Sequence, residues 1–268
     1  MEGRPIRILL AIWGNYKNWR TATYKYRGEE FTSSTTLPLL FKAIEPDYTY
    51  VIVADTLMDE YMDEVNSNYQ QGIEKVREKT KIYIEEKMGE YTNDLEEKNL
   101  DILVLPGVGT FSKLKFIGDP NNFYALVYYK LGKSILKIMN DHKLIFGNSK
   151  EENKPCIEFY LDITHGLNYM TMMTYRAVKD ILQIVAYFCK VQLVVLNSDP
   201  YPLLKSGGEG FLLNINEIER INVIPVFNFY RYHHLKLLKP SEFFDNEERE
   251  NIGRTINQKK TMEKVRKD

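Results

Sequence analysis

The sequence predicts an α/β protein with a Rossmann-like, mostly parallel sheet and helices on both faces of that sheet. Two observations support this fold class. Five short apolar runs have the composition of strands buried on both faces, and polar or glycine-containing residues follow each run. Helical apolar patterns lie between these runs, and such alternation is typical of parallel βαβ units. The expected strands cover residues 6–12, 48–54, 101–105, 157–163 and 191–196.

Four further segments are predicted to be helical. The first has an apolar stripe over residues 37–44, and the cluster of four hydroxyl residues at 33–36 that precedes it suits an N-cap. Residues 57–100 are mostly polar, so we expect a long, exposed helical insertion at the edge of the sheet. The helices over 121–140 and 166–190 are more apolar, and the second of these is expected to be the more buried.

The C-terminal part of the chain changes character. Two further strands are expected over 211–215 and 221–229, which we interpret as a β-hairpin with Pro225 at an edge position or a bulge. Residues 249–268 hold seven basic and three acidic residues, which predicts a charged surface or partner-packed helix. Docking of an effector domain or nucleic acid on this helix is the alternative. The predicted domains are a ligand-binding domain over 1–230 and a linker with a charged C-terminal helix over 231–268.

Charge and composition exclude several classes of protein. The chain has 268 residues, with 36 Lys and Arg against 37 Asp and Glu, so a strongly basic nucleic-acid-binding coat is excluded. No apolar stretch approaches the ~18 residues of a membrane span, and the N-terminus lacks the apolar core of a signal peptide. The two cysteines, Cys156 and Cys189, are too few for a disulfide framework. We therefore expect a cytoplasmic protein that contacts no membrane and keeps its thiols reduced.

The functional site is expected where the parallel strands end, because open α/β sheets bind ligands beyond these ends, near the switch in strand order. The first strand ends in Trp13, Gly14, Asn15 and Tyr16. After the third strand, Gly107 and Gly109 resemble half of a dinucleotide fingerprint, but Ser112 stands at the third glycine position. Phosphate-loop, metal-binding histidine and paired-cysteine motifs are absent from the sequence, so no cofactor and no metal ion is predicted.

The most informative stretch follows the fourth strand. Asp162 lies in an otherwise apolar run, where a carboxylate without a partner is costly. Thr164 and His165 stand at the strand's end, and Gly166 permits a tight turn or the close approach of a ligand to backbone amides. Asn168 lies in the first turn of the next helix, whose free amides attract phosphate. In the alternative interpretation, Asp162 caps this helix and His165 is a structural hydrogen-bonding residue.

This stretch, L-D-I-T-H-G-L-N-Y at 161–169, resembles the signature of CARF domains, the CRISPR-associated Rossmann fold family. The strand end W-G-N-Y at 13–16 and the string S-S-T-T at 33–36 agree with this resemblance. Over about residues 6 to 230, the chain is similar to the N-terminal half of the CARF–HEPN ribonucleases of type III CRISPR systems.

The resemblance implies a homodimeric sensor in antiviral defence that binds one cyclic oligoadenylate, usually the four-membered ring, in a groove across its twofold axis. It further implies that hydroxyl groups and backbone amides meet the phosphates. Adenines are expected to stack on Trp13 or Tyr16 and to bond to Asn15 or Asn168. The expected ligand-binding residues are Trp13, Gly14, Asn15, Tyr16, Ser33, Ser34, Thr35, Thr36, Gly107, Thr164, His165, Gly166 and Asn168.

The chain departs from the CARF–HEPN pattern in one respect. The HEPN catalytic motif has an arginine five positions before a histidine, and none of the four histidines here is preceded in this way. About 40 residues follow Phe229, which we expect to be too few for such a domain. The resemblance therefore implies the sensor module without that ribonuclease.

Three hypotheses follow. The first is a binding sensor without catalysis. The second is a metal-independent ring nuclease, in which a ribose 2′-hydroxyl attacks its own phosphate while the protein holds the attack in line and stabilises charge. Its candidate catalytic residues are His165 (acid or charge stabiliser), Thr164 and Asn15, with Lys17 as a further candidate. The third is an unrelated Rossmann-like nucleotide enzyme.

Overall fold

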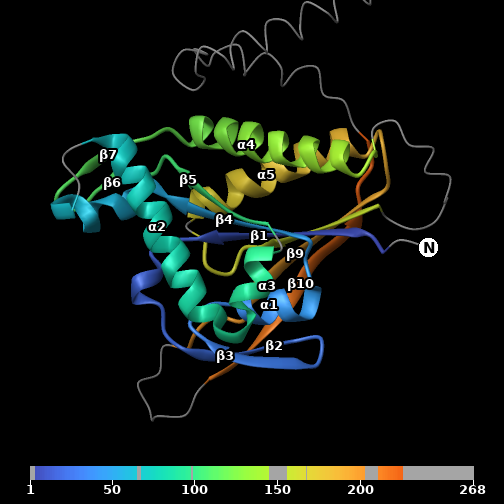
Figure 1. Ribbon diagram of the computed structural model, residues 1–268, viewed down its shortest axis with the longest axis horizontal. Coiled ribbons are helices and arrows are strands. Elements are labelled where there is room, and N and C mark those ends of the chain that lie inside the picture. The colour runs from blue at the N-terminus through green and yellow to red at the C-terminus, as the bar shows by residue number, and fades with distance from the viewer. Residues whose placement is uncertain are drawn as a thin grey trace, which may run out of the picture. The chain divides into compact units, whose positions relative to one another are not determined.

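The computed structural model describes residues 4–64, 68–97, 99–144, 156–166, 168–202 and 211–225. They form an eight-stranded mixed sheet with helices on both faces, so the predicted Rossmann-like α/β class is confirmed (Figure 1). The strand order is β3-β2-β10-β9-β8-β1-β4-β5, and β6 (Val108–Thr110) and β7 (Lys115–Ile117) form a separate two-stranded ribbon.

All five predicted core strands are present and run parallel to one another. Side by side, they follow the order β9-β8-β1-β4-β5. Each is largely apolar because this part of the sheet is covered on both faces. The five strands are β1 (Ile6–Trp13), β4 (Tyr48–Ala54), β5 (Leu100–Leu105), β8 (Ile157–Asp162) and β9 (Val191–Ser198).

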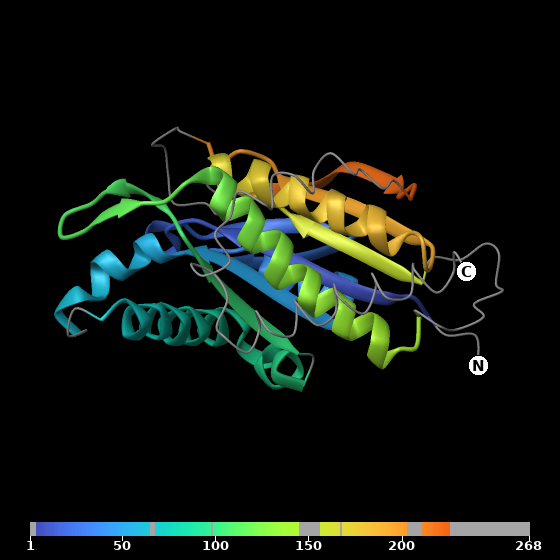
Figure 2. The ribbon, with the colours of Figure 1, turned by 90° about the horizontal axis from the view of Figure 1, so that it is seen from above.

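Two hydrophobic clusters, one on each face of the sheet, form the core. Side chains alternate along β1, so that Leu9 and Trp13 belong to one cluster and Leu10 and Ile12 to the other. Figures 1 and 2 show the helices that cover these faces. The first cluster is covered by α1 (Leu37–Ile44), α2 (Tyr69–Met88) and α3 (Thr92–Glu97), and the second by α4 (Pro120–Asp141) and α5 (Asn168–Val185).

The helical insertion expected at the sheet edge over 57–100 is instead the crossover between β4 and β5, which pair in parallel. The crossover contains the 3-10 helices η2 (Asp55–Glu64) and η3 (Gly89–Tyr91) as well as α2 and α3. Most buried residues of α2 are three or four positions apart, so they form one narrow stripe along one face of the helix. The rest of the helix is polar, which explains why the segment suggests an exposed insertion. The stripe consists of Gly72, Ile73, Val76, Thr80, Ile84 and Met88.

A hairpin of β2 (Ala22–Tyr26) and β3 (Glu29–Ser33) adds two strands that the apolar runs do not predict. Arg27 and Gly28 form its two-residue turn, with positive φ angles of 50° and 87°. This is the geometry of a type I′ turn, which matches the twist of the strands. Buried and half-buried residues alternate along β2, and this alternation around an R-G pair is the sequence signal for the hairpin.

The β-hairpin expected over 211–229 is replaced, as far as the structure describes this region, by one long strand. β10 (Leu212–Asn222) pairs antiparallel with β9 and parallel with β2. Its polar middle, which suggests a turn, is accommodated by a bulge between Glu217 and Glu219 and by an exposed face. Pro225 lies beyond this strand, and the linker and charged helix expected over 231–268 lie outside the described residues.

The other predicted helices are present with shifted ends. The first begins at Leu37, directly after the hydroxyl cluster as predicted, whereas the last runs from Asn168 to Val185 and is shorter at both ends than the predicted 166–190. Thr36 occupies the N-cap position of α1 but makes no side-chain cap hydrogen bond. Within the described ranges, no helix combines the length and the apolar character needed to cross a membrane.

Candidate functional site

The carboxyl ends of β1 and β8 lie next to each other at the switch point of the sheet. From β1, the chain proceeds to β4 and β5 on one side and then returns through α4 to β8 and β9 on the other. Loops on either side of such a point diverge and leave a crevice for ligands. The Gly14 N–H, after β1, donates a 2.8 Å hydrogen bond to the His165 carbonyl oxygen, after β8. The structure thus brings these two predicted site residues together.

Asp162 joins separate segments of this crevice. It is 1% exposed and accepts hydrogen bonds from the Thr36 hydroxyl at 2.5 Å and the Thr164 backbone N–H at 3.0 Å. The Thr164 hydroxyl oxygen in turn accepts a 3.0 Å bond from the Ser198 N–H at the end of β9. The partners of Asp162 are thus Thr36, directly before α1, and Thr164, in the loop after β8. Neither belongs to α5, so these bonds do not support the alternative in which Asp162 caps that helix.

The hydroxyl residues before α1 are buried and bond to protein. Ser34 Oγ lies 2.7 Å from the Tyr83 hydroxyl. The side-chain oxygens of Ser33 and Thr35 each accept a 3.3 Å bond from the backbone N–H two residues ahead. Such local bonds favour a tight turn into the helix. The segment that contains Thr36 is therefore firmly positioned beside β8.

Trp13 and Tyr16, the expected base-stacking residues, are buried in an aromatic cluster instead. Trp13 is 0% exposed and Tyr16 is 2% exposed. The Trp13 ring packs edge-on against Trp19 at 5.3 Å and against Tyr83 at 6.0 Å between ring centroids. The Tyr16 hydroxyl lies 3.1 Å from Thr80 Oγ1 of α2, and burial raises the pKa of Tyr16. Stacking needs an open ring face, so the structure does not support it at these two positions.

His165 packs flat against Trp19, with ring centroids 4.1 Å apart. Its Nε2 atom is shielded from solvent and has no hydrogen-bond partner among the described residues. Burial lowers the pKa of His165, and the nearby Asp162 carboxylate opposes this effect. The neutral imidazole is therefore the favoured form near pH 7.

Asn15 and Lys17, two candidate catalytic residues after β1, turn toward η2. The Asn15 side-chain amide donates to Glu60 at 2.8 Å, and the Lys17 ammonium lies 2.5 Å from the same carboxylate. Lys17 also lies 4.2 Å from the centroid of the Tyr61 ring. These contacts tie the loop after β1 to the crossover between β4 and β5. The side chain of Asn168 lies outside the described residues, although its backbone begins α5.

Gly166 is required by close packing. A Cβ atom at this position would lie 2.2 Å from Thr171 Oγ1 of α5 and 3.2 Å from Ile12 Cγ2 of β1. Even alanine would therefore push the loop away from the helix. This contact explains why the signature string carries glycine immediately before α5.

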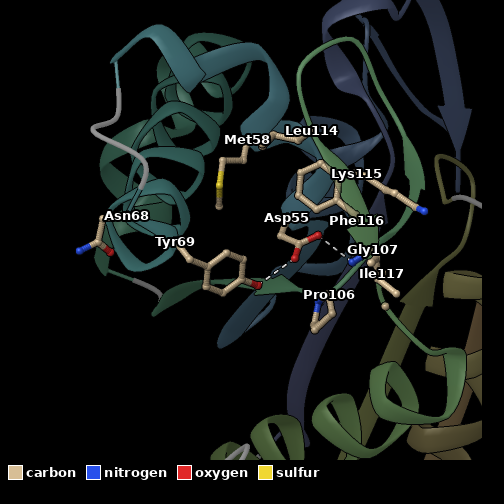
Figure 3. Close-up of a pocket in the computed structure, with 11 residues that line it drawn as sticks. Asp55, Met58, Asn68, Tyr69, Pro106, Gly107, Leu114, Lys115, Phe116 and Ile117 are labelled. Atoms are coloured by element: carbon tan, nitrogen blue, oxygen red, sulfur yellow. Dashed lines mark hydrogen bonds between the residues drawn. The ribbon is translucent and has the colours of Figure 1, made fainter.

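Gly107 lies apart from these loops, in a cavity of about 380 Å³ at the ends of β4 and β5 (Figure 3). Its backbone N–H donates a 2.7 Å bond to Asp55, which also accepts a 2.8 Å bond from the Tyr69 hydroxyl. A Cβ atom on Gly107 would lie 2.4 Å from Thr56 Cγ2, so only glycine fits this approach. Burial raises the pKa of Asp55, and the two hydrogen bonds oppose that rise.

Tyr69 is a functional candidate that the sequence did not suggest, and Asp55 is one that the sequence places at a strand end without a role. A signal for Asp55 exists, because this carboxylate directly follows an apolar strand. No comparable signal marks Tyr69, which the crossover folds back toward the strand end. Among the described residues, no three His, Cys, Asp or Glu side chains gather in a way that could hold a metal ion.

Three comparisons with known proteins bear on this site. The family described as "CRISPR system endoribonuclease Csx1, CARF domain" matches residues 8–200. CRISPR system endoribonuclease Csx1 of Methanocaldococcus jannaschii is 34% identical over 266 residues, which cover 97% of this chain and 50% of that protein. The chain thus spans about half the length of this relative.

A solved structure of Enterococcus italicus Csm6 bound to cyclic hexa-2′-fluoro-hexa-dAMP is weakly similar. It is 13% identical with a TM-score of 0.34, over 76% of this chain and 36% of that one. The family match has a stronger basis, because it extends through the five core strands and includes the loops after β1 and β8. The chain belongs to the Csx1 CARF-domain family of type III CRISPR systems.

Proposed function

We propose that this chain is a sensor that binds a cyclic oligoadenylate, in particular the four-membered ring, at the carboxyl ends of β1 and β8. Membership of the CARF family supports the proposal, because the sequence resemblance implies this ligand class. The observation that carries it is the hydrogen bond between Gly14 and His165. This bond holds the two signature loops together at the switch point, where open α/β sheets bind nucleotides.

The local chemistry of the crevice suits a ring of phosphodiesters. α5 begins with Asn168, directly after the signature loop, and the free N–H groups in the first turn of a helix attract phosphate. A ring with few phosphates needs only local donors of this kind. The formal net charge of −1 is therefore compatible with the proposed ligand.

We also propose that two copies bind one ring across a twofold axis, because a twofold-symmetric ring matches two identical half-sites. Apolar side chains exposed on the β6–β7 ribbon offer surface that a second copy would cover. Val108, Phe111 and Ile117 are 46%, 45% and 85% exposed. Binding of an effector domain or nucleic acid by the C-terminal helix stays a prediction, since that segment lies outside the described residues.

The first prediction concerns binding itself. Calorimetry with cyclic tetra-adenylate should give saturable binding with one ring for every two chains. Linear tetra-adenylate is the matched control, and it should bind more weakly because its ends are not held in the twofold geometry. No binding of the cyclic ligand at micromolar concentration would contradict the proposal.

Ring cleavage is a second candidate function. One observation favours it: His165 Nε2 has no hydrogen-bond partner among the described residues, although it lies in the signature loop. Cleavage would proceed by attack of a ribose 2′-hydroxyl on its own phosphate, which leaves a 2′,3′-cyclic phosphate. The imidazole of His165, which is neutral in the free protein, could stabilise developing charge as a hydrogen-bond donor. It could also act as an acid if the phosphates of the bound ring favour its protonation. Thr164 and Asn15 are supporting candidates.

The second prediction separates cleavage from binding. If the ring is cleaved, His165→Ala should slow cleavage by about 10²-fold or more, the usual contribution of a general acid. Ring affinity should change much less. Chromatography measures the cleavage rate and calorimetry measures the affinity. His142→Ala is the control, because His142 lies at the C-terminal end of α4 beside Tyr48. An equal loss of both would mean that His165 only shapes the crevice.

A further inference from the structure

The cavity around Asp55 contains a buried carboxylate that the proposed function has not used. Asp55 is 4% exposed, and within the described part of the chain it pairs with no cationic side chain. Its partners there are the Gly107 N–H and the Tyr69 hydroxyl, one on each oxygen (Figure 3). Each carboxylate oxygen can accept a second hydrogen bond. The group can therefore still accept a donor from a molecule in the cavity.

The walls of this cavity are mainly apolar. Tyr69 and Phe116 contribute aromatic rings, and Met58 and Pro106 contribute apolar surface (Figure 3). The volume of about 380 Å³ lies at the lower end of the range for small-molecule sites, roughly 300–1,000 Å³. An acceptor set among aromatic and apolar walls suits a planar heterocycle that carries an exocyclic amine.

The cavity lies at the same edge of the sheet as the crevice, and hydrogen bonds connect the segments that border the two. The Tyr169 hydroxyl, from the first turn of α5, donates a 3.5 Å bond to the carbonyl oxygen of Pro106 in the cavity wall. From the other side, the bonds of Asn15 and Lys17 to Glu60 connect the loop after β1 to η2, which begins at Asp55. The segments that border the crevice are therefore bonded to the segments that border the cavity.

We infer that this cavity receives one adenine of the cyclic oligoadenylate, whose exocyclic amine donates to Asp55 while Phe116 packs against the base. The inference rests on the proposed function. It also resolves a conflict, because Trp13 and Tyr16 have no open ring face on which an adenine could stack. The bond from the exocyclic amine to Asp55 would then explain why the sensor binds adenine in preference to a base without that amine.

The experiment varies the ligand and leaves the protein unchanged. Calorimetry compares cyclic tetra-adenylate with the same ring built from purine riboside, which lacks only the exocyclic amine. The amine-free ring should bind about tenfold more weakly or worse, the usual effect of losing a hydrogen bond to a charged group. Equal binding of both rings overturns the inference alone. Failure of both rings to bind overturns the proposed function and, with it, this inference.

Two matched variants test the role of Asp55 itself. Asp55→Leu should bring the affinities for the two rings within about twofold of each other, because leucine has a similar size and no acceptor for the amine. Asp59→Asn is the control, since Asp59 is equally buried but bonds to the backbone N–H groups of Ser112, Lys113 and Leu114 instead. It should preserve the full discrimination. Discrimination that survives in Asp55→Leu, or that disappears in Asp59→Asn, overturns the inference.

Discussion

Replacing Trp13 by alanine is expected to lower the free energy of unfolding by about 3–5 kcal/mol, the usual cost of removing a buried tryptophan. The indole is 0% exposed and lies at the end of β1 among the rings of Tyr16, Trp19 and Tyr83. Its loss would leave a cavity under the Gly14–His165 bond. Urea denaturation followed by circular dichroism measures the change.

The control for this prediction is Phe188→Ala, because Phe188 is 45% exposed and its truncation should cost far less. Trp13→Phe separates packing from ligand stacking. It retains most of the buried area and removes an indole N–H that has no partner among the described residues. This variant should therefore bind the ring normally. A folded Trp13→Phe protein that no longer binds would show that the base does contact Trp13.

Replacing Asp162 by alanine is expected to abolish most ring binding and to cost about 2–3 kcal/mol of stability, because hydrogen bonds to a charged group are lost. The Thr36 hydroxyl would be left buried without its acceptor. The loop after β8 would also lose the anchor of the Thr164 N–H. Since both segments border the crevice, its shape should change. Calorimetry and chemical denaturation measure the two effects.

Conservative changes make this prediction sharper. Asp162→Asn keeps an acceptor for the Thr164 N–H and can donate to Thr36, so it should retain more binding than the alanine variant. Asp101→Ala on β5, at the end of the sheet beyond β1 and β4, is the control, because Asp101 is exposed. The double variant Asp162→Ala with Thr36→Val should cost less than the sum of the single changes. Strict additivity would mean that the bond between these residues contributes nothing.

The sequence alone predicted the five parallel strands, since burial on both faces leaves an unmistakable continuous apolar run. It also singled out Asp162, because a carboxylate in such a run needs partners. The crossover helix α2 and strand β10 were harder to predict. Each buries only a narrow stripe or one face, and their many polar residues are typical of exposed segments or turns.

Only the tertiary structure decided which side chains reach the site. Trp13 and Tyr16 follow the strand-end pattern of ligand contacts, yet both rings are buried against Trp19 and Tyr83. The structure also assembled a cavity from Asp55, Tyr69 and Gly107, which are up to 52 residues apart in the chain. Local patterns report which residues prefer burial. Contacts between segments that are distant in the sequence decide which of these residues are covered and which line a cavity. They therefore determine which side chains a ligand can reach.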